Sequence, residues 1–256
     1  MRAMLHWLAR LSPIFVLLVV WEAVALAGLV KPFLLPAPHV VAGRVWHDLA
    51  SGQFALNASL TLYRALTGFV VACVIGVPTG ILIASERWVR WLAEPLISVG
   101  FPMPKIAFLP VFMLWFGVYD FSKIVMVCFA AVFAVVAAAE AGTRGVDKFM
   151  LWSARAMGAS RADVFREVIL PAAMPQFLTG MQIALPVSLI TAVAAEMLMG
   201  GAGLGGAMLA AGNYADSPGV FAGIVETSVV GLVAVAGMTA LRRYLLRWHA
   251  EFNPRG

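Results

Sequence analysis

The ionisable side chains of Lys105, Glu196 and Glu226 lie inside long apolar stretches of this 256-residue sequence. A charge in hydrocarbon is costly, so such residues face protein or water and often line a path for ions or polar solutes. Pro102 and Pro104 precede Lys105, and their rings interrupt a helix and leave carbonyl groups without helical partners. We interpret all three charged residues as candidates for a translocation path.

Each of these three charged residues allows more than one interpretation. Lys105 attracts an anionic solute, or it supports the interrupted helix. Glu226 pairs with Lys105, contacts a cationic group such as an amine, or is buried against a polar neighbour. Glu196 comes near the end of its apolar stretch, where it helps to close an external gate or contacts a partner protein.

Enzyme chemistry finds little support in the sequence. A Gly-x-Gly-x-x-Gly pattern at 201–206 follows an apolar stretch and has no β-α-β context, so we expect a flexible or tightly turned loop and not a nucleotide site. The four histidines lack metal-ligand spacing, and the sequence contains no His-Glu-x-x-His, Gly-x-Ser-x-Gly or Gly-x-x-x-x-Gly-Lys-Ser/Thr. We therefore predict that the chain is not an enzyme and has no catalytic residue, metal ligand or bound cofactor.

The composition indicates an all-α membrane protein. Hydrophobic residues make up 62% of the chain and charged residues 12%, too few to cover a soluble protein. A helix needs about 20 residues to cross the hydrocarbon. Six stretches approach or reach that length, and we predict one membrane domain over 1–256 with about six spans, at 13–30, 65–85, 95–119, 124–140, 175–196 and 220–241.

Basic residues predict the orientation. If both termini are cytoplasmic, most of the 18 lysines and arginines fall on the cytoplasmic side, and only Lys31, Arg44 and Lys123 fall clearly outside. The net charge of +5 then reflects topology and gives no reason to expect nucleic acid. The first span also has features of a cleavable signal peptide, but Trp21 and Glu22 interrupt its apolar run and favour an uncleaved helix.

The segment 142–171, between the fourth and fifth predicted spans, combines charges with large apolar side chains. Asp147 can cap a helix that starts at Lys148, Gly158 can stop it, and the run 160–163 fits a capping box that opens a second helix. We expect Pro171 to end that second helix. The exposed apolar face of such a pair either lies on lipid headgroups or inserts into a groove on a cytoplasmic partner.

The same segment resembles the cytoplasmic signature of bacterial ATP-binding cassette importer permeases, which reads Glu-Ala-Ala, three residues, Gly, nine residues, Ile-x-Leu-Pro. Ala154 takes the third position, Gly158 follows after three residues, and nine more lead to the run 168–171. Trp152 stands where the signature has glutamate, which puts a polar contact in doubt and favours more apolar docking. The resemblance implies that the ATPase couples through Trp152, Ala154, Met157, Gly158, Ala159, Phe165, Leu170 and Pro171.

Further segments extend the resemblance to most of the chain, and the sequence is most similar to the nitrate, sulfonate and taurine branch of these permeases. These segments include 35–38, 104–107, 115–117 and 203–205. The resemblance implies the type I importer permease architecture with a cytoplasmic coupling helix. It also implies a location in the bacterial inner membrane and a small anionic or zwitterionic solute.

The partners implied by the resemblance are a second permease subunit, which we expect to be an identical copy, a cytoplasmic ATPase dimer and an extracytoplasmic binding protein. ATP and magnesium would be used by the ATPase partner. A pyrimidine vitamin precursor or an aromatic acid stays open as the solute. The alternative is an ion-coupled secondary transporter without an ATPase; the sequence shows no internal repeat of the kind found in many such transporters.

Overall fold

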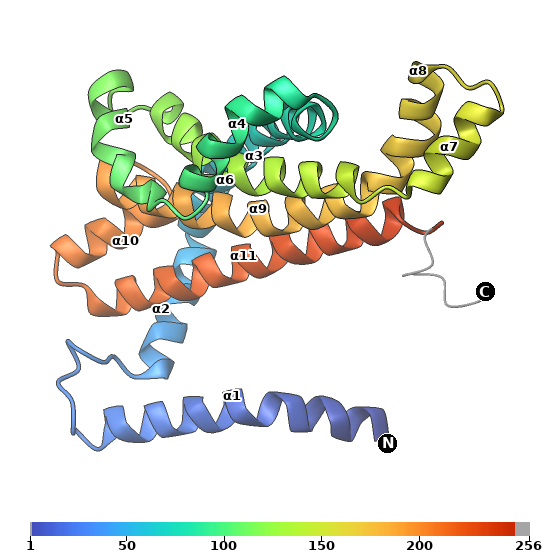
Figure 1. Ribbon diagram of the computed structural model, residues 1–256. Coiled ribbons are helices and arrows are strands. Elements are labelled where there is room, and N and C mark those ends of the chain that lie inside the picture. The colour runs from blue at the N-terminus through green and yellow to red at the C-terminus, as the bar shows by residue number, and fades with distance from the viewer. Residues whose placement is uncertain (1, 249–256) are drawn as a thin grey trace. The chain divides into compact units, whose positions relative to one another are not determined.

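The computed structural model describes the backbone of residues 2–248 and the side chains of residues 12–248, and all regular structure in this part of the chain is helical (Figure 1). The predicted all-α fold is confirmed. The basic side chains of Arg2, Arg10 and Arg255, which support the predicted orientation, lie outside the described side chains. The elements are α1 (Arg2–Leu26), α2 (Pro38–Ala50), α3 (Gln53–Ser85), α4 (Arg87–Gly100), η1 (Lys105–Phe108), α5 (Leu109–Phe116), α6 (Asp120–Arg144), α7 (Lys148–Ala156), α8 (Arg161–Asp163), η2 (Val164–Ile169), α9 (Leu170–Met199), α10 (Leu204–Asn213) and α11 (Ser217–Leu245).

Four helical stretches of the described chain are long and apolar enough to cross a membrane: Gln53–Ser85, Asp120–Arg144, Arg161–Met199 and Ser217–Leu245. A fifth is formed if α4 and the η1–α5 pair count as one span, bent by 96°. The apolar part of α1, Ser12–Leu26, is shorter. Four of the six predicted stretches therefore lie within long helices and a fifth in the bent pair, while a span at 13–30 stays a prediction.

The helices form two compact units. Within the described residues, one contains 2–60 and 200–229, and the other contains 61–199 and 230–248. Both α3 and α11 contribute residues to each unit, so the units are not successive along the chain.

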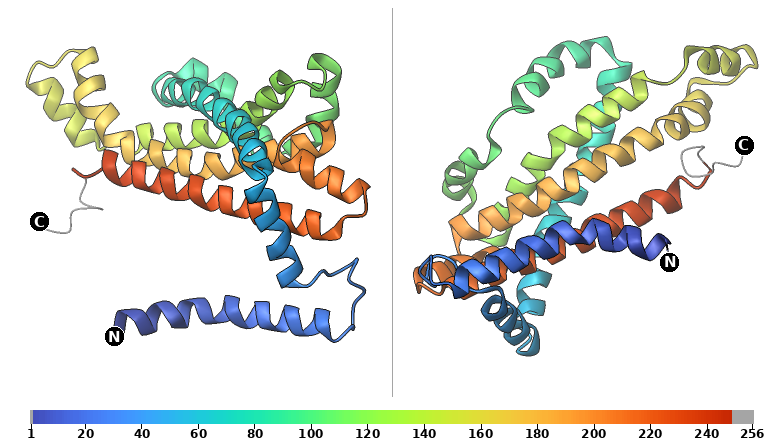
Figure 2. Two further views of the ribbon diagram at one scale, coloured as in Figure 1. Left: turned by 180° about the vertical axis from the view of Figure 1, so that it is seen from behind. Right: turned by 90° about the horizontal axis from the view of Figure 1, so that it is seen from below.

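The larger unit is built on α6 and α9, which run side by side in all three ribbon views (Figures 1 and 2). Residues of α3 spaced four apart, Gly68, Ala72, Gly76 and Gly80, face α6. A Cβ built on Gly80 would lie 2.5 Å from the carbonyl oxygen of Val136. Small residues at this spacing let two helix backbones approach closely where lipid provides no hydrophobic drive for packing.

The third predicted span is broken at Lys105. Helix α4 ends at Gly100, and the chain restarts as the short η1 and α5 after Pro102 and Pro104. Pro110 occupies the first turn of α5, where a missing N–H is tolerated. The interruption expected from the prolines is confirmed, and Lys105 lies at the break and not within a continuous helix.

Residues 201–206 were expected to form a flexible or tightly turned loop. Residues 201–203 do form a bend, but α10 begins at Leu204; Gly203 is its N-cap, and the Gly203 backbone N–H donates to Asn57 Oδ1 over 3.1 Å. Gly201 and Gly203 adopt φ values of 94° and 128°, which side chains rarely permit. The glycines therefore serve a tight entry into a helix.

Candidate functional site

The segment 142–171 folds locally as its sequence predicts. The Asp147 carboxylate accepts a hydrogen bond of 2.8 Å from the Phe149 backbone N–H and caps α7. Ser160 and Asp163 form the predicted capping box at the start of α8. Because both caps satisfy N–H groups that have no helical partner, the two short helices have defined starting points.

Gly158 closes α7 in the left-handed conformation, with φ at 88°. The Gly158 N–H donates to the Arg155 carbonyl over 3.0 Å, and the Ala159 N–H donates to the Ala154 carbonyl over 3.1 Å. These two bonds define a Schellman motif, which requires a left-handed residue at this position. A Cβ on Gly158 would meet no atom within 4 Å, so the backbone conformation and not crowding selects glycine.

The expectation that Pro171 ends the second helix is wrong. The π-helical turn η2 follows α8 and leads directly into α9, and Pro171 is the second residue of α9. A proline lacks the N–H of the ordinary helical bond, and a π-turn supplies a break in the bonding pattern just before it. The second helix of the segment is therefore continuous with the fifth predicted span, as one stretch over Arg161–Met199.

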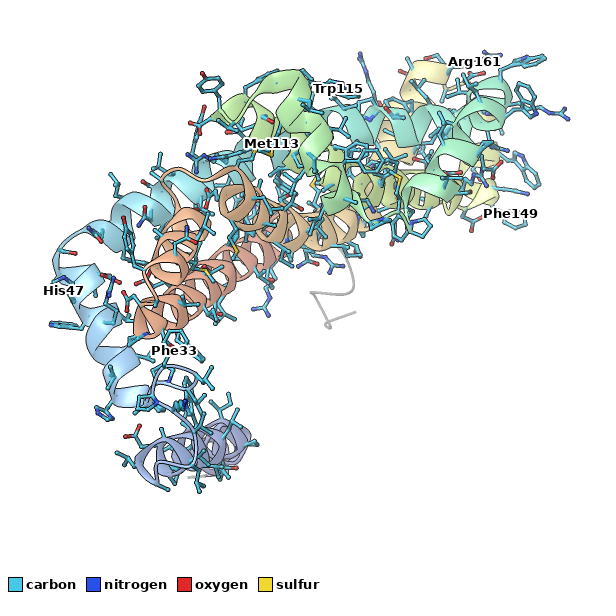
Figure 3. All side chains as sticks on the ribbon, turned by 90° about the vertical axis from the view of Figure 1, so that its left-hand side faces the viewer. Phe33, His47, Met113, Trp115, Phe149 and Arg161 are labelled. Atoms are coloured by element: carbon cyan, nitrogen blue, oxygen red, sulfur yellow. The ribbon has the colours of Figure 1, made fainter. Side chains whose placement is uncertain are left out.

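One face of α7 is anchored and the other is exposed. Leu151 packs against the cluster that contains Val146 and Phe177, and Ala154 is buried. Phe149 and Trp152 are 71% and 58% exposed, and their rings meet edge to face with centroids 5.4 Å apart. Figure 3 shows Phe149 directed away from the ribbon.

The other predicted coupling residues divide in the same way. Met157 is 82% exposed at the end of α7. Ala159, Phe165 and Pro171 are half-buried, and the half-buried Leu170 packs on the same cluster as Leu151. The exposed apolar patch is thus made by Phe149, Met150, Trp152 and Met157. The residues on the buried face of α7 hold this patch in place by packing against neighbouring elements.

Lys105 interacts with the groups that the broken helix leaves free. Its ammonium group donates to the Phe101 carbonyl over 2.6 Å, and it lies 5.4 Å from the centre of the Phe133 ring. Phe101 follows the last residue of α4, where carbonyls lack helical partners. This geometry supports the structural interpretation of Lys105, while the side chain remains partly exposed.

Glu196 is the centre of a buried polar cluster that sequence reasoning missed. Its carboxylate is fully buried and accepts hydrogen bonds from Thr61 Oγ1, at 2.8 and 3.0 Å, and from Arg64 Nη1, at 2.6 Å. Arg64 also donates through Nε to Asp120 Oδ1 over 2.9 Å. The cluster joins the N-terminal half of α3, the first turn of α6 and the last turns of α9.

Lys123 is predicted to lie on the outer side of the membrane, and this stays a prediction. In the structure, Lys123 is 2% exposed and lies within electrostatic reach of Arg64, Asp120 and Glu196. The sequence signal for this cluster was that charged residues lie at the ends of apolar stretches, because the ends of neighbouring spans lie at the same depth in the membrane. The sequence does not indicate which of these charged residues contact one another.

Glu226 lies in the smaller unit and is 6% exposed. Its Oε1 accepts no hydrogen bond from any residue that the structure describes. The charged neighbours are Arg44 and Asp48, which pair with each other over 3.1 Å. Burial beside polar neighbours is therefore the interpretation that the geometry favours, and the pairing of Glu226 with Lys105 stays a prediction.

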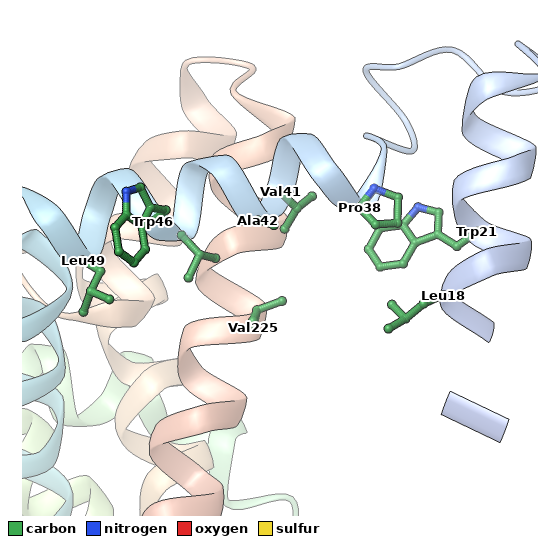
Figure 4. Close-up of a pocket in the computed structure, with 9 residues that line it drawn as sticks. Leu18, Trp21, Pro38, Val41, Ala42, Trp46, Leu49 and Val225 are labelled. Carbon is green, nitrogen blue, oxygen red and sulfur yellow. The ribbon is translucent and has the colours of Figure 1, made fainter. Parts of the chain in front are cut away.

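An apolar pocket of about 290 Å³ lies between α1, α2 and α11 within the smaller unit (Figure 4). Trp21 and Trp46 contribute its largest side chains, and every lining residue is apolar or aromatic. The pocket offers no charged group to a polar solute. Among the described residues, no three of the His, Cys, Asp and Glu side chains are placed to hold a metal ion.

Long apolar helices, a broken span and a capped helix pair with an exposed aromatic patch define the class: a membrane transport subunit. Comparison with known proteins gives the family. Residues 76–247 match the family model described as the binding-protein-dependent transport system inner membrane component. The chain belongs to this family, and it is a multi-pass permease of the inner membrane.

Comparison with individual proteins supports the same family assignment. The chain is 37% identical to the taurine transport system permease protein TauC of Escherichia coli over 92% of this chain and 88% of that one. It is 29% identical to the putative aliphatic sulfonates transport permease protein SsuC of Bacillus subtilis, over 96% and 90% of the two chains. An inward-facing structure of the MetNI methionine ABC transporter matches with a TM-score of 0.67 at 18% identity, covering 77% of this chain and 98% of that one.

These findings confirm the fold of an ATP-binding cassette importer permease. In this family the ATPase activity belongs to a separate subunit, and the permease is not an enzyme. Its members work in general with such ATPases and with substrate-binding proteins.

Proposed function

We propose that this chain forms the translocation path for a small sulfonate or a related anionic or zwitterionic solute, and that the exposed patch on α7 couples this path to a separate ATPase. The main observation behind the proposal is the patch formed by Phe149, Met150, Trp152 and Met157. These four large apolar side chains are exposed, while the buried face of the same helix packs against its neighbours. A partner groove that accepts an apolar helix face is the chemistry that such a patch fits.

The continuity of α8, η2 and α9 supports a mechanical role for the segment. Helix α9 has 30 residues and is about 45 Å long at 1.5 Å per residue. It begins next to α7, where Leu170 packs on the same apolar cluster as Leu151, and it carries Glu196 near its other end. Movement of the ATPase subunits would therefore displace a continuous helix that reaches the charged cluster, as alternating access requires.

The solute class follows from the relatives. The taurine and aliphatic sulfonate permeases transport molecules with a sulfonate group, as their names state. The sequence resemblance to the nitrate, sulfonate and taurine branch adds nitrate as a further candidate solute. Lys105, Glu196 and Glu226 are our candidates for the translocation path, with Lys105 also supporting the break between α4 and α5.

The proposed assembly contains two copies of this chain, an ATPase dimer that uses ATP and magnesium, and an extracytoplasmic binding protein. Both termini face the cytoplasm in this arrangement, and the α7 patch lies on the same side. This chain binds no cofactor. The alternative, a self-sufficient ion-coupled transporter, would need no ATPase.

Reconstitution distinguishes the two. Proteoliposomes that contain this chain, its ATPase subunits and the binding protein should accumulate taurine or an alkanesulfonate only with ATP at the ATPase side. Ionophores that remove ion gradients should leave uptake unchanged. If vesicles with this chain as their sole protein accumulate the solute, and ionophores abolish that uptake, the ATP-driven mechanism is wrong.

A further inference from the structure

The apolar pocket of the smaller unit is built around one stripe of α2. The side chains of this stripe recur at the spacing of a single helix face, and they are Pro38, Val41, Ala42, Val45, Trp46 and Leu49. Leu18 and Trp21 of α1 form one wall of the pocket, and Val225 of α11 forms another (Figure 4). Trp46 and Leu49 are 70% and 51% exposed, so the described residues cover the stripe only in part.

Helix α1 is fixed to the smaller unit by Trp21 and Glu22. The Trp21 indole N–H donates to the Pro36 carbonyl over 3.1 Å, and the Glu22 carboxylate lies 2.6 Å from His39 Nδ1. The large apolar side chains of residues 14–20, which precede this attachment, are 43–68% exposed. Because Leu18 belongs both to this run and to the pocket wall, the pocket is continuous with apolar helix surface of the kind that lipid covers.

The wall formed by Val225 lies at the depth of the hydrocarbon. Helix α11 has 29 residues and is about 44 Å long, whereas the hydrocarbon is about 30 Å thick. A helix centred in the membrane therefore extends about 7 Å beyond the hydrocarbon at either end. Val225 lies about 12 Å along the axis from Ser217, where α11 begins. The pocket is thus open to acyl chains and not only to water.

The volume of the pocket distinguishes two occupants, a helix of a second copy and an acyl chain. One turn of an α-helix with its side chains fills about 500 Å³, since the helix is 10–12 Å wide and rises 5.4 Å per turn. The pocket holds about 290 Å³, which is less than one such turn. An apolar cavity of about 150 Å³ accepts benzene, so the pocket has room for a segment of an alkyl chain.

We propose that the pocket binds one acyl chain of a membrane phospholipid, with the Trp46 indole at the level of the lipid ester groups. The Trp46 N–H has no acceptor among the described residues, whereas that of Trp21 is satisfied by the protein. Tryptophans gather at the border of the hydrocarbon, where the ring is apolar on one side and the N–H meets polar groups on the other. No lining residue is charged, so the site selects the chain and not the headgroup.

Filling the pocket should displace the chain. Ala42→Phe adds an apolar ring to the stripe at an exposed position, and each methylene group that the ring displaces should weaken binding about fourfold. Val40→Phe is the matched control. Val40 does not line the pocket and lies about 200° around α2 from Ala42, so the same ring is added to the opposite face of the helix.

The test uses the complex of this chain with its ATPase subunits in vesicles of phosphatidylethanolamine and phosphatidylglycerol. The probe is phosphatidylethanolamine with a diazirine in the middle of one acyl chain. After illumination, mass spectrometry measures the label on Leu18 and Val225 as a fraction of the label on the whole chain. Both residues lie on walls that the variants leave unchanged. Ala42→Phe should lower this fraction at least fourfold, and Val40→Phe should not change it. A phosphatidylglycerol probe with the same chain should give the same result.

Three outcomes would overturn the proposal. Absence of label on Leu18 and Val225 in the unmodified complex would show that lipid does not enter, as expected if a second copy covers the pocket. Label that Ala42→Phe does not reduce would show ordinary boundary lipid without a site. Label from only one of the two probes would show selection of the headgroup. Ala42→Leu, a smaller filler with an intermediate expected effect, replaces Ala42→Phe if the latter lowers the unfolding temperature.

Discussion

The Arg64 guanidinium and the Glu196 carboxylate, separated by 132 positions in the chain, form a buried ion pair with 2.6 Å between Nη1 and Oε1. Removing one partner of such a pair leaves a buried charge without its counter-ion and costs about 3–5 kcal/mol. We expect Glu196→Gln to lower the thermal unfolding temperature of the solubilised protein clearly. Glu140→Gln, whose arginine partner is 41% exposed, should have a much smaller effect, and equal effects of the two would contradict the importance of the buried pair.

The conformation of Gly158 should govern coupling. At a φ of 88°, valine is strained by about 1–2 kcal/mol or more, while asparagine tolerates this region. Gly158→Val and Gly158→Asp should both reduce ATPase association and uptake, the first through the backbone and the second through an added charge. Gly158→Asn should retain most of both activities. Co-purification of the ATPase and uptake rates check this order, and unaltered values for the valine and aspartate variants would count against the docking role.

Different residues of α7 should contribute to ATPase docking and to folding stability. Trp152→Ala, with or without Phe149→Ala, removes exposed rings and should weaken ATPase association while leaving the unfolding temperature nearly unchanged. Leu151→Ala removes a side chain that packs on the cluster below and should lower the unfolding temperature. Loss of stability without loss of association in Trp152→Ala would show that the patch serves the fold instead.

Lys105 should influence the solute more than the assembly. Lys105→Ala removes a positive charge at the break and should reduce anion uptake while the permease still co-purifies with its ATPase. The lost hydrogen bond to the Phe101 carbonyl should also cost about 1.5–3 kcal/mol, since the donor is charged. Lys105→Met is the control for the apolar stem. Normal uptake kinetics together with a lower unfolding temperature would assign Lys105 a structural role only.

Close packing of α3 on α6 should make Gly80 intolerant of a side chain. A Cβ there would lie 2.5 Å from the Val136 carbonyl oxygen and 2.6 Å from the Ala139 Cβ, so Gly80→Ala should destabilise by about 1–3 kcal/mol. Gly231→Ala in α11 is the control, because its Cβ would meet nothing within 4 Å. The control should be neutral or slightly stabilising, since alanine favours helix. Similar unfolding temperatures for both variants would contradict the packing argument.

Local and compositional features were readable from the amino acids alone. The membrane environment follows from the excess of apolar residues, and the caps at Asp147 and Ser160 follow from hydrogen bonds that span three residues or fewer. The glycine stop at Gly158 and the break near Lys105 also depend only on neighbouring backbone preferences. For the same reason the signature of the permease family, a spacing of residues within one segment, was recognisable.

Contacts between distant segments needed the tertiary structure. Sequence alone does not predict that Arg64, Asp120 and Lys123 gather around Glu196, because each contact depends on how α3, α6 and α9 pack. The helix after Ser160 also continues through Pro171 against local expectation, since the π-turn before it provides a break in the helical hydrogen-bond pattern. Short-range hydrogen bonds are thus decided by adjacent residues, while the partners of buried charges are decided by which helices share a core.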